Sequence, residues 1–140
     1  MKKFKAIFVL AFLFLSLKTY AESNPYFYQL FSQGPYKQSL SKIFRSENKP
    51  SWITTYLATG NGVETPVTYL TLSDGRYILG DVCKPHDCGG NMLHILFSSS
   101  GNSAWAALYQ EGRPAKFYGN PDPEKYQVLW NALKKDESIY

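Results

Sequence analysis

Two cysteines and a histidine lie within one stretch of six residues, Cys83-Lys84-Pro85-His86-Asp87-Cys88. These are the only cysteines in the 140-residue chain. Thiols and an imidazole at this spacing are compatible with a disulfide-closed loop, a metal site or redox chemistry. Because four residues separate the cysteines, instead of the two of thiol oxidoreductases, redox catalysis is the weakest of the three hypotheses.

The N-terminus has the composition of a secretory signal peptide. Three lysines among the first five residues precede an apolar run over residues 6–15, and a small residue, Ala21, ends a short polar segment. The apolar run is too short for a stable membrane-spanning helix. We therefore expect cleavage after Ala21, export to an oxidising compartment, and pairing of the two cysteines in a disulfide.

Cleavage at this position changes the charge of the protein. The full chain has fifteen Lys and Arg against eleven Asp and Glu, and four of the lysines belong to residues 1–21. The remaining 119 residues carry eleven of each sign. This balance gives no basic excess for nucleic acid or an anionic membrane, and the length fits one domain over residues 22–140.

A metal site is the second interpretation of the cysteine segment. Cys83, His86, Cys88 and His94 offer four ligands, but their spacing matches no common zinc pattern, and an oxidising compartment would consume both thiols. His94 alternates with apolar residues in a predicted strand, which favours a buried structural histidine. A periplasmic metal or ligand binder that uses the two cysteines and the histidines is the alternative hypothesis.

The chain has no motif of an enzyme or of a cofactor site. Ser98-Ser99-Ser100-Gly101 is a turn and not a nucleophile elbow, and paired carboxylates, a phosphate loop and triad spacing are absent. We therefore expect neither catalysis nor a cofactor.

Hydrophobic periodicity predicts helices before a group of strands. Asn24-Pro25 resembles a helix start, a second helical pattern runs from Tyr36 to Phe44, and residues 51–65 are compatible with a strand or a connector. Strands are predicted from the period-two pattern. Their ranges are 67–72, 76–82, 91–97, 104–109 and 115–118.

The last predicted element is a helix with Asp122 as its N-cap and Pro123 as its first residue. Short connections between the strands favour antiparallel neighbours. The sequence therefore predicts an α+β domain: an antiparallel sheet of about five strands with helices packed on it, in a three-layer α/β/α sandwich.

The hexapeptide at 83–88 resembles, position for position, the signature loop of the Ivy family, which are periplasmic inhibitors of vertebrate c-type lysozyme. A leader, helices ahead of the sheet, and strands entering and leaving the loop agree with this resemblance. The resemblance implies that the loop enters the lysozyme cleft and that His86 lies between the two catalytic carboxylates. Lys84, Pro85 and Asp87 would shape and flank it, and Cys83 and Cys88 would close the loop.

The implied partner is a c-type lysozyme, with lytic transglycosylases of the cell itself as a second kind of target. The implied location is the periplasm. An imidazole suits this role because its two ring nitrogens lie on roughly opposite sides and reach two acceptors at once.

Overall fold

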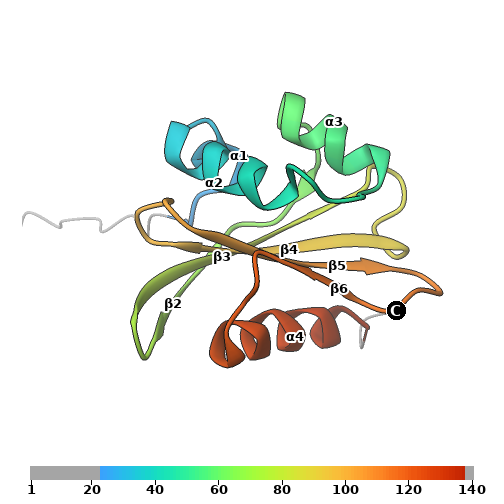
Figure 1. Ribbon diagram of the computed structural model, residues 1–140. Helices are drawn as coiled ribbons and strands as arrows, with labels where there is room; N and C mark the ends of the chain where they lie inside the picture. The colour runs from blue at the N-terminus through green and yellow to red at the C-terminus, as the bar shows by residue number, and fades with distance from the viewer. Residues whose placement is uncertain (1–22, 138–140) are drawn as a thin grey trace, which may run out of the picture.

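The computed structural model describes residues 23–137, so the predicted leader and its cleavage site lie outside the described residues. Three helices precede six consecutive strands, and a fourth helix follows them, so the chain forms an α+β domain and the predicted fold class is confirmed (Figure 1). The helices are α1 (Phe27–Phe31), α2 (Gly34–Phe44), α3 (Ser51–Thr59) and α4 (Pro123–Glu137). The strands are β1 (Val63–Glu64), β2 (Thr68–Leu72), β3 (Gly75–Cys83), β4 (Asn91–Ser98), β5 (Ala104–Gln110) and β6 (Lys116–Tyr118).

All strand pairs are antiparallel, as the short connections predict. The order across the sheet is β1-β3-β4-β5-β6, and β2 also pairs with β3 along a different part of that strand. The long central strands β3 and β4 pair from Tyr77 opposite Ser98 to Cys83 opposite Met92. This register places the last residue of β3 next to the start of β4, and the cysteine segment connects these two points.

The sheet separates two helical layers, which gives the predicted three-layer sandwich. Helices α1, α2 and α3 cover one face, and α4 covers the other (Figure 1). Among residues 23–137, no helix combines the length and the apolar composition that crossing a membrane requires.

Alternation along β4 builds a core on each side of the sheet. Leu93, Ile95 and Phe97 are buried with the residues of α1, α2 and α3, whereas Leu96 is buried with Leu129 of α4. Helix α1 approaches the sheet closely because β3 has a glycine there. A Cβ on Gly80 would lie 2.1 Å from the Phe27 ring.

Two expectations about the N-terminal half were wrong. Residues 51–59 form a helix and neither a strand nor a connector, because Ile53 and Tyr56, three residues apart, are both fully buried in the core. The first helix begins at Phe27 and not after Asn24, whose side-chain amide instead donates to the carbonyl of Val67 at 2.9 Å. The predicted cap of α4 is confirmed, since Asp122 Oδ1 accepts from the Lys125 amide at 3.0 Å.

Candidate functional site

The cysteine segment forms a closed loop between the two central strands. Cys83 ends β3, and it is joined to Cys88 by a disulfide with a Cα–Cα distance of 4.9 Å. Beyond Cys83, the Lys84 amide donates to the carbonyl of Asn91 at 3.1 Å, so the β3–β4 pairing continues into the base of the loop. The loop is therefore held by a covalent bond and by the sheet.

A tight turn places His86 at the tip of this loop. The Asp87 amide donates to the carbonyl of Lys84 at 3.0 Å, which leaves Pro85 and His86 as the two central residues. Both are exposed. His86 has φ 64°, and a positive φ at the second central position is characteristic of type II turns with proline before it.

A left-handed backbone is uncommon for residues other than glycine, although histidine adopts it more often than most. Residues in this region usually require support from the structure around them. Here the ring of Pro85 fixes the φ of the residue before His86, and the disulfide holds the two ends of the loop together. The turn therefore determines the direction in which the His86 side chain leaves the loop.

The side chain of Asp87 supports the loop from within. Its Oδ2 accepts from Lys84 Nζ at 3.1 Å and from Asn91 Nδ2 at 2.8 Å. These donors, Lys84 first, hold the pKa of the Asp87 carboxyl below its ordinary value. Gly90 provides the space for this carboxylate, because a Cβ there would lie 2.6 Å from Asp87 Oδ1.

The loop is also connected to the neighbouring hairpin. The Asn91 amide donates to the carbonyl of Asp87 at 3.0 Å, and Asn91 Oδ1 accepts from Gln110 Nε2 at 3.3 Å. The Glu111 amide donates to the carbonyl of Gly90 at 2.9 Å. The end of β5 thus supports the loop, a role of Asn91 and Gln110 that the sequence analysis missed.

His94 lies away from the loop tip. It is 5% exposed in the middle of β4, where it pairs with Asp81 of β3 and Ala107 of β5. The burial of His94 agrees with the structural role predicted for it. The metal hypothesis gains no support, since both cysteines are in the disulfide and no group of three metal-ligating side chains occurs among residues 23–137.

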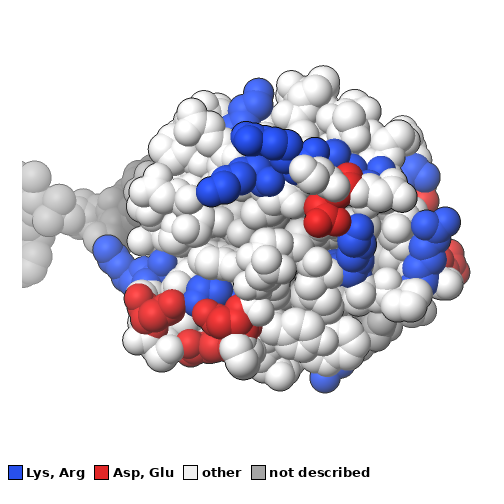
Figure 2. Space-filling model, viewed as in Figure 1, with Lys and Arg blue, Asp and Glu red and all other residues white. Residues whose placement is uncertain are grey.

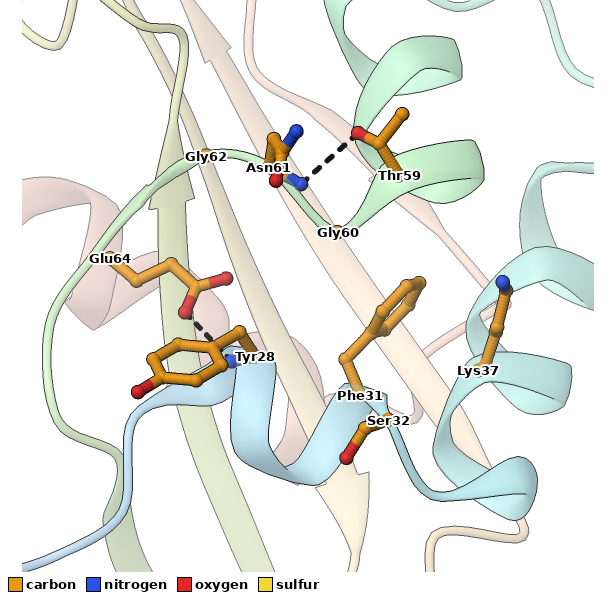
Figure 3. A pocket seen from close by; sticks show the side chains of 9 residues that line it. All are labelled: Tyr28, Phe31, Ser32, Lys37, Thr59, Gly60, Asn61, Gly62 and Glu64. Atoms are coloured by element: carbon orange, nitrogen blue, oxygen red, sulfur yellow. Dashed lines mark hydrogen bonds between the residues drawn. The ribbon is translucent and has the colours of Figure 1, made fainter.

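A separate pocket lies between α1 and the end of α3 and shares no residue with the loop (Figure 3). Its carboxylate, Glu64, accepts from the Tyr28 amide at 2.7 Å and from the Tyr56 hydroxyl at 3.0 Å. Burial raises the pKa of Glu64 despite these two donors. Since both oxygens of Glu64 bind groups of the protein itself, we assign this carboxylate to the packing of α1 on α3.

Exposed loops that a rigid scaffold positions are common places for binding residues, and this loop is of that kind. Comparison with known protein families shows to which family the chain belongs. A family model described as "Inhibitor of vertebrate lysozyme (Ivy)" matches residues 35–135. The chain belongs to this family, as the hexapeptide predicted.

Individual relatives agree with this assignment. The chain is 30% identical over 130 residues to an inhibitor of vertebrate lysozyme from Pseudomonas aeruginosa, and the match covers 83% of the chain and 82% of the relative. It is 27% identical over 99 residues to the protein of that name from Escherichia coli K12, and this match covers 71% of the chain and 60% of the relative. An uncharacterized protein of Yersinia pestis is 28% identical to the chain over 127 residues, and this match covers 81% of the chain and 80% of the relative.

Proposed function

We propose that this protein inhibits c-type lysozyme without turnover, by inserting the loop of residues 83–88 into the active-site cleft. The observation that carries the proposal is the placement of His86. It is exposed at the tip of a loop that the disulfide closes and the sheet supports. Membership of the lysozyme-inhibitor family supports the choice of target.

The chemistry of the cleft fits an imidazole. A retaining glycosidase holds its two catalytic carboxyl groups about 5–5.5 Å apart. A protonated imidazole donates from both ring nitrogens, so a single His86 side chain forms a charge-assisted hydrogen bond with each carboxylate. The inserted loop contains no glycosidic bond, so the enzyme is occupied and nothing is cleaved.

The loop is built to dock with little loss of conformational entropy. The disulfide, Pro85 and the hydrogen bonds of Asp87 restrict the conformations open to the loop in the free protein. A segment that is ordered before binding does not have to be ordered during binding, which retains more of the contact free energy as affinity. Lys84 and Asp87 thus act as positioning residues for His86.

We further propose that residues 1–21 direct export and are removed, and that residues 22–140 act in the periplasm as one domain. Three lysines, an apolar run and Ala21 support this processing step. The protein would then meet a lysozyme that enters the cell envelope from outside.

Clearing of a peptidoglycan suspension by a c-type lysozyme tests the proposal directly. Purified protein that begins at residue 22 should stop clearing at a ratio near one inhibitor per enzyme, and should itself remain intact. A lytic transglycosylase assayed in parallel tests the second kind of target. Undiminished clearing of the suspension at a large excess of the protein would contradict the proposed function.

A further inference from the structure

An open groove of about 670 Å³ lies beside the loop. Its walls come from three segments: the connection from α2 to α3, the base of the loop, and the turn from β5 to β6. This volume is in the range of small-molecule sites. The residues are Asn48, Lys49, Pro50, Ser51, Trp52, Lys84, Asn91, Gln110, Arg113, Pro114, Lys116 and Tyr118.

The groove contains four cations, Lys49, Lys84, Arg113 and Lys116. Asp87 is paired with Lys84 at 3.1 Å and Glu47 with Lys116 at 3.2 Å. Lys49 Nζ instead donates to two backbone carbonyls, the nearer at 3.0 Å. The four cations that line the groove therefore outnumber the two carboxylates that pair with them.

The wider surface is also polarised, although residues 22–140 carry equal numbers of acidic and basic residues. Figure 2 shows Lys and Arg gathered in a band over the helical layer, and Asp and Glu gathered at the lower left. Acidic Asp74, Asp122 and Glu124 lie near the β2–β3 turn and the start of α4. The band of cations favours an anionic ligand on that side of the molecule.

Donors also outnumber acceptors among the side chains of the groove. Trp52 Nε1 is buried and has no hydrogen-bond partner among the described residues, and the same is true of the hydroxyl of Tyr118. Buried polar groups of this kind usually pair with a water, an ion or a ligand. An indole N–H donates and does not accept, and the same is true of the lysine and arginine side chains. The groove therefore favours a ligand rich in acceptors.

We propose that this groove binds a carboxylate-bearing saccharide of the cell wall. The cations and the free donors define the anionic, acceptor-rich class, and the choice of a wall glycan rests on the proposed function. Peptidoglycan fits this class, because its stem peptides carry free carboxyl groups and because a muramic acid unit without a stem peptide keeps its lactyl carboxylate. An acidic protein segment fits less well, since an enzyme that binds an anionic glycan is expected to present cations around its own cleft.

The groove shares Lys84 with the loop. A bound glycan would therefore lie next to the point at which the loop meets the enzyme. This arrangement would hold the inhibitor on the polymer that its target attacks.

Titration of 15N-labelled protein by NMR tests the groove. N-acetylmuramic acid and N-acetylglucosamine differ by the lactyl group, which carries the carboxylate, so they form a matched pair of probes. We expect N-acetylmuramic acid to shift the Trp52 indole N–H signal saturably, and N-acetylglucosamine to leave it in place. Trp105 and Trp130, which pack in the α4 core, provide internal controls.

The double variant Arg113→Gln/Lys116→Gln should weaken this binding about tenfold. Lys37→Gln/Lys42→Gln on α2 makes the same change of charge on exposed residues outside the groove and should bind normally. An unshifted Trp52 signal, or equal affinity in the two variants, would overturn the proposal. So would tetraglutamate that shifts Trp52 as strongly as N-acetylmuramic acid does, because the occupant would then be an acidic peptide.

This test is separable from the test of inhibition. The Arg113→Gln/Lys116→Gln variant should still inhibit lysozyme on a soluble chitooligosaccharide substrate, which lacks carboxylates. Failure of the wild-type protein to inhibit would contradict the proposed function and leave the titration interpretable.

Discussion

Lys84 and Asp87 form an ion pair across the turn that carries His86, with 3.1 Å between Lys84 Nζ and Asp87 Oδ2. The acidic neighbour of His86 is therefore occupied within the loop, where it also binds Asn91. If Asp87 instead extended from the tip, its charge would repel the carboxylates of a glycosidase. The pair thus positions the loop and shields a charge at once.

Acidification should release this pair. Because Lys84 and Asn91 lower the pKa of Asp87, the ionised form stabilises the folded loop at pH values above the ordinary aspartate pKa of about 3.9. That contribution is lost as the pH falls through the lowered pKa. Titration of the Asp87 carboxyl carbon by NMR should give a midpoint below about 3.9, and Lys84→Met should raise it. A midpoint at or above the ordinary value would contradict the ion pair.

Removal of the disulfide should affect binding more than folding. On the chain-entropy model, closing a loop of this length stabilises the protein by about 2 kcal/mol. Cys83→Ala/Cys88→Ala should therefore still fold, with a lower melting temperature. Its inhibition constant for lysozyme should rise at least tenfold, because the loop must now be ordered on docking. Equal inhibition by the double variant and the wild type would exclude a role of the disulfide in preorganisation.

Gly90 should tolerate no side chain. Gly90→Ala would place a Cβ 2.6 Å from Asp87 Oδ1, so the carboxylate must move and its bonds to Lys84 and Asn91 must lengthen. We expect weaker inhibition and a changed Asn91 side-chain amide signal in NMR spectra. Gly34→Ala is the matched control, because its Cβ would have only an ordinary contact, 3.9 Å from the Gln38 side chain.

The sheet could be predicted from the sequence because period-two alternation and turn residues are local signals. Strands β3 and β4 each lie within one residue of their predicted bounds. Helix α3 could not be predicted in this way, because Ile53, Thr54 and Thr55 are β-branched and favour strands. The helix forms because it buries Ile53 and Tyr56 in the core, and this burial depends on residues far away in the sequence.

The candidate site was visible in the sequence only in part. The hexapeptide identified the loop and its cysteines, since all six residues are contiguous. The positive φ of His86 and the support from Gln110 were not predictable from these residues. The Gln110 contact depends on how β4 pairs with β5, which places Asn91 opposite Gln110. A motif can therefore name the residues of a loop without showing what holds them in place.

The two histidines provide the sharpest test, because one is exposed at the loop tip and the other is 5% exposed within β4. His86→Ala should remove most inhibition and leave the melting temperature nearly unchanged. Truncation of a central interface contact can cost about 2 kcal/mol or more, which is roughly a thirtyfold loss of affinity. His94→Ala should have the reverse effect, with a lower melting temperature and near-normal binding by the folded fraction.

A second substitution separates the imidazole from the backbone of the turn. Asparagine accepts the left-handed conformation that His86 adopts at φ 64°, so His86→Asn should keep the loop in shape. It replaces the imidazole by an amide with one donor nitrogen and one acceptor oxygen, which cannot donate to a carboxylate on each side. We expect His86→Asn to inhibit as poorly as His86→Ala, measured by peptidoglycan clearing and thermal melts on the same preparations. Strong inhibition by His86→Asn would show that the shape of the loop, and not a bridge between two carboxylates, carries the activity.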